Sequence, residues 1–219
     1  MRTGGRTATF TAEDLVEAGV RIGLADVTVQ AVATALGVTT AAVYRRVPSR
    51  AALETLVGEA VLDGLVLTDD PGHSTVEQLV GFAARLREFT LANPGTAQYF
   101  LGLFPRGRSG VRLLEQQIVA LGRRGYDPAA ATALSSAMAT VALGATVAEQ
   151  EREVAHRDPV AVETALAAMA GSALVQQAVA GLPPHTPEDY FMLMVTALAT
   201  GLVAAYPAGA PITLPGRDR

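Results

Sequence analysis

Hydrophobic residues recur every three or four positions along most of the chain, which is the period of an amphipathic helix. Val29, Val32, Ala33 and Leu36 show this spacing in a short segment near the amino terminus. No alternation of apolar and polar residues continues for more than a few positions, so the sequence gives no sign of a strand. The pattern predicts an all-α protein.

Capping residues, glycines and prolines divide this pattern into separate helices. Thr28 precedes an apolar-periodic segment that Gly37 can end, and Pro48 stops the next one. Ser49 can then cap a longer helix. The expected helices cover about residues 12–23, 29–36, 39 or 40 to 47, 50–67, 75–92, 95–104, 108–124, 128–155, 160–180 and 187–206.

Residues 27–50 have the pattern of a helix-turn-helix, in which the second helix enters the major groove of DNA. Gly37 provides the tight turn, and Val38 and Val43 are expected to point inward. Hydroxyl and guanidinium groups suit phosphates and base edges, and a small apolar side chain can approach a thymine methyl. The residues expected on the outward face are Thr39, Thr40, Ala42, Tyr44, Arg45 and Arg46.

This segment resembles the DNA-binding domain of the TetR family of bacterial repressors. The resemblance covers about residues 11–62 and rests on the run 29–47 and on Ser49-Arg50 before Leu53, although Arg46 and Val47 stand where His-Phe is usual. It implies that Tyr44 and Arg50 mainly contact phosphate, and we expect Thr40, Ala42 and Arg45 to read bases. The full set it places on a palindromic double-stranded operator is Thr28, Gln30, Thr39, Thr40, Ala42, Tyr44, Arg45 and Arg50.

The segments 114–126, 133–135 and 143–151 resemble the regulatory domain of the tetracycline-repressor branch of that family. The resemblance implies a helix-turn-helix domain at 1–50 and a helical ligand-binding and dimerisation body at 51–207. The positions that hold a drug–magnesium chelate in that branch correspond to Val66, Ala83, Leu101 and Ala148, none of which can bind a hard cation. We therefore expect a small apolar effector, with no metal or other cofactor.

Ligand pockets are mostly apolar with a few polar anchors, and Gln117 is the one polar side chain retained from that ligand set. For each candidate, an ordinary place in the hydrophobic core is the alternative interpretation. The pocket candidates are Leu101, Phe104, Leu114, Gln117, Met138, Val141 and Val147.

Two predicted helices are rich in small residues, at 129–148 and 192–205. Small side chains let helices approach closely, so these segments could form a four-helix bundle across a twofold axis. An alanine-rich composition could also simply reflect a GC-rich genome. We expect a homodimer, because one head contacts little DNA and two heads about one helical turn apart contact enough.

Composition adds limits to this interpretation. The chain has no cysteine, which excludes disulfides and thiolate chemistry. The net charge of −4 divides into +1 for residues 1–57 and −5 for the remainder, as suits a head that touches phosphate. Charged residues or proline interrupt the apolar segments and no signal-peptide core follows Arg2 and Arg6, so we expect a cytoplasmic protein without a membrane span and with a disordered tail at 208–219.

The alternative function is a helical small-molecule-binding protein or enzyme in which the DNA-binding head is secondary. Residues 102–109 have the spacing of a P-loop with Arg in place of Lys, but no strand precedes them and Pro105 is better interpreted as a helix break. Glu149, Glu151 and Glu153 with His156 could suggest a metal site, although residues two apart lie on different helix faces. No nucleophile, base and orienting group occur at a recognisable spacing, so we expect no enzyme.

Overall fold

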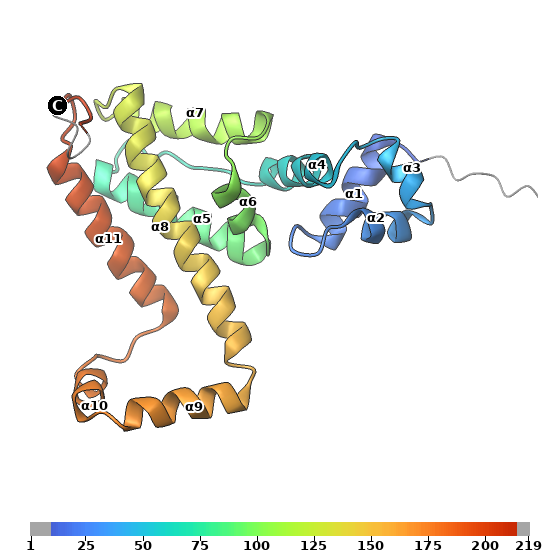
Figure 1. Cartoon of the computed structure of the whole chain (residues 1–219). Coiled ribbons are helices and arrows are strands. Elements are labelled where there is room, and N and C mark those ends of the chain that lie inside the picture. Colours follow the sequence, from blue (N-terminus) through green and yellow to red (C-terminus); the bar gives the residue numbers. More distant parts are fainter. Residues whose placement is uncertain (1–9, 214–219) are drawn as a thin grey trace, which may run out of the picture.

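The computed structural model describes residues 10–213, and in this range it contains helices and no strand, which confirms the predicted all-α class. Figure 1 shows a small head at one end of an elongated molecule, a larger body, and a projecting arm. The helices are α1 (Ala12–Ile22), α2 (Val29–Leu36), α3 (Thr40–Tyr44), α4 (Arg50–Asp63), α5 (Thr75–Ala92), α6 (Thr96–Gly102), α7 (Arg108–Gly122), α8 (Pro128–Ala155), α9 (Pro159–Ala170), α10 (Ala173–Ala180) and α11 (Pro187–Ala205).

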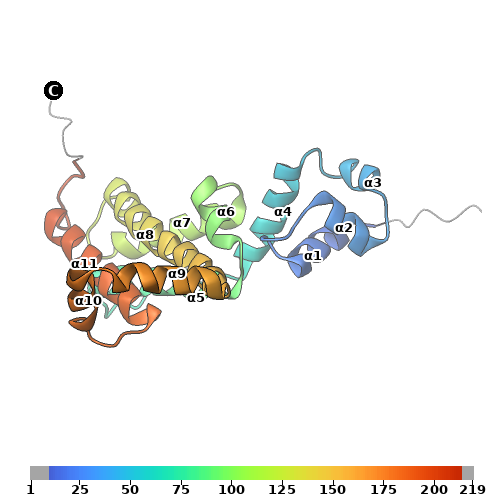
Figure 2. The same ribbon diagram turned by 60° about the horizontal axis from the view of Figure 1, so that its bottom comes forward.

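The head consists of α1, α2, α3 and the first half of α4, packed around their own apolar core. Leu15, Val32 and Val43 are fully or almost fully buried in it. Leu53 and Val57 of α4 belong to the same core, so the packing of the head continues past residue 50. α4 therefore serves both as a wall of the head and as its connection to the body (Figure 2).

Local signals in the sequence place α2 and α3 as expected. The Thr28 side chain accepts a hydrogen bond from the Ala31 amide, and the Thr39 side chain accepts one from the Ala42 amide. Between the two helices Gly37 adopts φ +65° and ψ +31°, a left-handed conformation that favours glycine. The helix-turn-helix geometry thus follows from two caps and one glycine.

The body is built from α5, α7, α8 and α11, with α6 covering one end. Leu79, Leu86, Leu134 and Met138 lie in its core. Arg87 and Glu149 join α5 to α8 by a bidentate ion pair with N–O distances of 2.8 to 3.0 Å, which adds directional contacts to the apolar packing.

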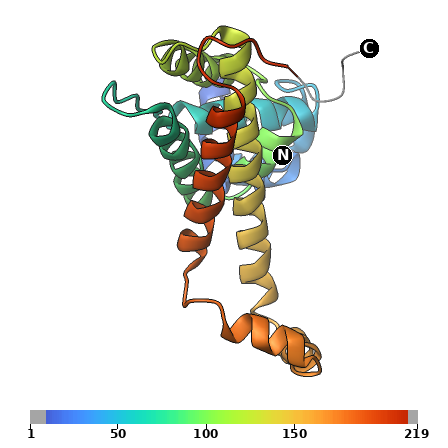
Figure 3. The same cartoon turned by 90° about the vertical axis from the view of Figure 1, so that its left-hand side faces the viewer.

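Helices α9 and α10 form an arm that projects from the body, and we call residues 159–180 the arm (Figures 1 and 3). The arm was expected as one helix over 160–180, which is wrong: the two helices meet at an angle of 103°. Gly171 ends α9, and the Ser172 side chain caps α10 by accepting from the Val175 amide. Neither helix has a buried residue.

The expectation that charges interrupt every apolar segment is also wrong. α8 and α11 are each long and apolar enough to cross a membrane, and the two bent helices of the arm meet the same criterion together. Residues 128–148 contain no charged side chain. Packing within the chain accounts for part of this uncharged segment, because α8 buries one face against α5, α6, α7 and α11.

Two expected boundaries differ in the structure. α4 ends at Asp63 rather than near Leu67, and Leu65 is then fully buried in the body core. The expected tail begins at residue 208, yet the Gly209 amide donates to the Gly125 carbonyl at 3.0 Å and Ile212 packs against the body core. Residues 209 and 212 of the expected tail therefore contact the body, and residues 214–219 lie outside the described range.

Gly95, at the turn between α5 and α6, lies directly against the loop that follows α1. Its φ is +87°, and a Cβ there would come within 2.3 Å of the Ala25 backbone nitrogen. We expect Gly95→Ala to destabilise the fold by about 2–4 kcal/mol, from left-handed strain and overpacking. Urea unfolding followed by circular dichroism measures this change.

Gly81→Ala in α5 is the matched control, because a Cβ at Gly81 would meet nothing within 4 Å. It should leave stability unchanged or raise it by up to about 1 kcal/mol. Equal midpoints for the two variants would contradict the close contact between head and body.

Candidate nucleic-acid interface and body pocket

The tip of the head, farthest from the body, carries α2 and α3 (Figure 1). Gln30, Thr39, Tyr44 and Arg45 are exposed there, as the sequence predicted for an outward face. Thr28 and Thr40 are half-buried. The Thr28 and Thr39 hydroxyls accept cap hydrogen bonds, and their own hydrogens stay free to donate.

Ala42 does not lie on this outward face, so its expected placement is wrong. Its relative exposure is 7%, and it belongs to the head core together with Val43. Ala41 takes the exposed position instead. The reason is the phase of a five-residue helix, in which neighbouring residues differ by about 100° and a shift of one position exchanges inside for outside.

Arg46 and Arg50 are exposed but already have partners within the chain. The Arg46 guanidinium lies 5.5 Å from the centre of the Phe10 ring. The Arg50 Nε donates to Glu54 at 2.7 Å, and 68% of the Arg50 side chain remains accessible. A phosphate could compete with this pair, because exposed ion pairs are weak.

The body contains a pocket of about 460 Å³ between α5, α6, α7, α8 and the loop after α6, which we call the slot. Four of the predicted pocket residues line it: Leu101, Phe104, Leu114 and Gln117. Leu101 and Leu103 are exposed at its rim. Sequence reasoning missed the contribution of α8, which comes from Thr132, Ser135, Ser136, Ala139, Thr140 and Leu143.

The other three candidates do not line the slot. Met138 is completely buried in the body core. Val141 and Val147 are partly buried and pack against that core. The helical period explains this difference, since Ser135, Ala139 and Leu143, four residues apart, form the face of α8 that turns to the slot.

Two buried polar groups of the slot have no hydrogen-bond partner within the protein. They are the Gln117 Oε1 atom and the Ser135 Oγ atom, on residues only 3% and 4% exposed. Burying such a group without a partner costs about 1–3 kcal/mol. The slot therefore contains polar sites that a bound molecule could satisfy.

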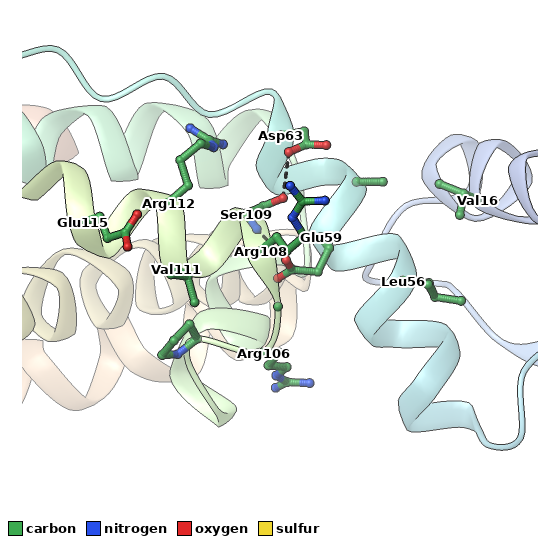
Figure 4. A pocket seen from close by; sticks show the side chains of 13 residues that line it. Val16, Leu56, Glu59, Asp63, Arg106, Arg108, Ser109, Val111, Arg112 and Glu115 are labelled. Carbon is green, nitrogen blue, oxygen red and sulfur yellow. Dashed lines mark hydrogen bonds between the residues drawn. The ribbon is translucent and has the colours of Figure 1, made fainter.

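At the junction between head and body, α4 and α7 cap each other's ends (Figure 4). α7 has no side-chain cap of its own; instead Glu59 Oε2 accepts from the Ser109 amide and Asp63 Oδ1 accepts from the Ser109 hydroxyl, both at 2.7 Å. In return Arg112 donates to the Leu62 and Leu65 carbonyls at the end of α4, at 2.9 and 3.2 Å. Each charge lies at the helix end whose dipole it complements.

A second contact of this junction joins α4 to α6. A Cβ at Gly58 would come within 2.3 Å of the Tyr99 ring, so this position of α4 requires glycine. The Arg106 guanidinium lies 4.2 Å from the centre of the same ring and donates to the Tyr99 and Leu103 carbonyls. Burial, followed by the negative charge of Glu59, raises the pKa of Tyr99 to about 12 and keeps its hydroxyl neutral.

The alternative chemical sites have ordinary structural explanations. Glu149 pairs with Arg87 and Glu153 with Arg157, while the His156 ring lies against the Arg152 carbonyl. No group of three or more His, Asp or Glu side chains positioned to hold a metal occurs within residues 10–213. The segment 102–109 is the end of α6, a loop and the start of α7, with no strand before it.

No family model matches the sequence, and no curated protein is similar enough in sequence to count as a relative. Solved structures do share its fold. A TetR variant from Acinetobacter baumannii in complex with minocycline superposes with a TM-score of 0.69 at 17% identity, over 95% of this chain and 99% of that one. ActR from Streptomyces coelicolor in complex with actinorhodin gives 0.69 at 21% identity, over 92% and 100%. A possible TetR family regulator from Streptomyces coelicolor A3(2) gives 0.71 at 22% identity, over 88% and 98%.

This chain therefore has the fold of the TetR family transcriptional regulators along most of its length. The fold expected from the sequence resemblance is confirmed.

Proposed function

We propose that this protein is a ligand-responsive transcriptional regulator, a repressor that leaves a palindromic operator when a small molecule fills the slot. The observation that carries the proposal is the helix-turn-helix at the tip of the head, whose exposed face presents Thr39, Tyr44 and Arg45. Hydroxyl and guanidinium groups suit phosphates and base edges. The fold supports a regulator rather than an enzyme, and the cytoplasm is where such a protein meets DNA.

A route from the slot to the head follows the chain. Phe104 and Pro105 line the slot, and Gly107 begins α7, where Glu59 and Asp63 hold Ser109. A molecule in the slot that moves this loop also moves the capped end of α7 and, with it, α4. Since α4 is part of the head core, this shifts the head. A ligand can do so only by binding the two arrangements with different affinity.

The functional unit we propose is a homodimer. The arm and the outer face of α11 carry large exposed apolar side chains, with Leu166 at 60%, Leu174 at 76% and Leu193 at 65%, and residues 128–148 of α8 carry no charge. Apolar surfaces of this extent mark an interface. A second copy fits better than a membrane, because Glu151, Arg152, Glu153, Arg157 and Asp158 separate the apolar part of α8 from the arm.

The DNA-binding proposal is tested by selection from random sequences followed by gel shifts at several salt concentrations. Arg45→Ala should lower affinity for the selected site about 10- to 100-fold and relax its sequence, as loss of a base contact does. Arg50→Ala should weaken binding to all sequences and lower the salt slope by about one, as loss of a phosphate contact does.

Arg157→Ala is the matched control, because Arg157, in the turn after α8, also forms an exposed ion pair with a glutamate four residues away. It should leave DNA binding unchanged. The absence of salt-sensitive, sequence-specific retention by the unaltered protein would contradict the proposed function. Equal effects of Arg45→Ala and Arg50→Ala would contradict the division between base and phosphate contacts.

The dimer is tested by sedimentation of two interface variants. Leu174→Asp places a charge on the arm, and Gly201→Arg places one on the exposed face of α11, where a side chain would meet nothing within the chain. Each should weaken the dimer at least about tenfold, because a buried unpaired charge is costly. Gly81→Arg, on an exposed position of α5 with equal space, is the control. A monomeric unaltered protein would refute the dimer.

A further inference from the structure

We propose that the effector of the slot is an uncharged, flat molecule with one polar edge, which lies with that edge along α7 and α8 and its apolar part against α5 and α6. This inference rests on the proposed function, in which the slot is the effector site. It sharpens the expectation of a small apolar effector. It follows from how the polar and apolar side chains are distributed over the slot wall.

The wall formed by α7 and α8 carries the polar side chains of the slot, beside the apolar Leu113, Leu114, Ala139 and Leu143. Gln117 on α7 and Ser135 on α8 are more than nine-tenths buried, and Oε1 of the first and Oγ of the second have no partner in the protein. The Thr132 and Thr140 hydroxyls donate to carbonyls of their own helix, so toward the slot they can only accept. These groups favour a molecule with a hydroxyl, amide or similar neutral group on one edge.

The opposite wall is apolar and aromatic. Phe82 of α5, Phe100 of α6 and Phe104 of the following loop line it, and the last two rings lie 5.0 Å apart at an angle of 47°. Leu65, which follows α4, and Leu86 of α5 complete this side. Aromatic walls favour a flat ring system, which gains stacking contacts in addition to buried area.

The slot contains no charged side chain among the residues that line it. An ionised ligand would therefore lose its hydration without gaining a counter-charge, which is strongly unfavourable. A purely apolar ligand would leave the Gln117 and Ser135 groups unsatisfied, as they are now. Only a neutral molecule with a polar edge avoids both costs.

Three probes of similar size separate these classes: 2-(hydroxymethyl)anthracene, 2-methylanthracene and anthracene-2-carboxylate. A hydroxyl can donate and accept, so it fits whichever group the Gln117 amide presents. Fluorescence titration of the full-length protein should show the alcohol binding about tenfold or more tightly than the methyl compound. The carboxylate should bind at least about 100-fold more weakly than the alcohol.

The Gln117→Leu variant tests the assignment of the polar edge, because it keeps a similar volume and removes the amide. It should abolish the preference for the alcohol over the methyl compound. Gln116→Leu is the matched control: it is the neighbouring residue of the same type, its Oε1 is also buried without a partner, and it lies outside the slot. This control should keep the full preference.

Four results would overturn the inference: equal or tighter binding of the methyl compound, tight binding of the carboxylate, an unchanged preference in Gln117→Leu, or no binding of any of the three probes. None of them bears on DNA binding, which is measured on the protein without a probe. Loss of the proposed function would appear instead as absent operator retention, with the probe preferences intact.

Discussion

The reciprocal capping of α4 and α7 is the contact on which the relation between head and body depends. α7 begins at a glycine N-cap that offers no side chain, so the carboxylates of Glu59 and Asp63, from another helix, take over its first turn. Arg112 returns the interaction at the carboxyl end of α4. Gly107 is part of this arrangement, since a Cβ there would come within 2.5 Å of Glu59 Oε2. A head built on α4 thus takes its position from α7.

This contact also gives a physical basis for the proposed response. The loop that supplies Phe104 and Pro105 to the slot leads directly into the capped end of α7. On the other side, Leu53 and Val57 fix α4 in the head core. The energy of a charged hydrogen bond depends strongly on its direction and distance. A small movement of the loop therefore changes the position of α4 at which these caps are most stable. The slot and the proposed DNA-binding face are then linked through α7 and α4.

The sequence predicted most local features, because caps, glycines and apolar spacing act over a few residues. The helix-turn-helix between Thr28 and Pro48 is one example, and four of the slot residues are another. It failed where a shift of one position around a helix exchanges a buried for an exposed residue, as for Ala42, which is buried while Ala41 is exposed. The break at Gly171-Ser172 was not predicted, because the alanine-rich segments on both sides favour one continuous helix. Gly171 nevertheless ends α9, and Ser172 caps α10.

The caps supplied by Glu59, Asp63 and Arg112 could not be predicted, because they join residues about 50 positions apart. Periodicity within one segment carries no information about such pairs. The exposed apolar side chains of α11 and the arm could be seen only in the structure, since a sequence pattern shows which residues are apolar and not which remain uncovered. In the proposed dimer, a second copy covers these side chains.

The distance between the two heads of the dimer tests the central claim, that the slot and the head are coupled through α4 and α7, most directly. The chain has no cysteine, so Ala35→Cys on the exposed side of α2 places a single spin label in each head. Pulsed electron paramagnetic resonance would compare the label-to-label distance without and with saturating 2-(hydroxymethyl)anthracene. The account predicts a shifted distance when the slot is filled, and a much smaller shift in Ser109→Ala, which loses the hydrogen bond to Asp63. An unchanged distance while fluorescence shows the slot occupied would contradict it.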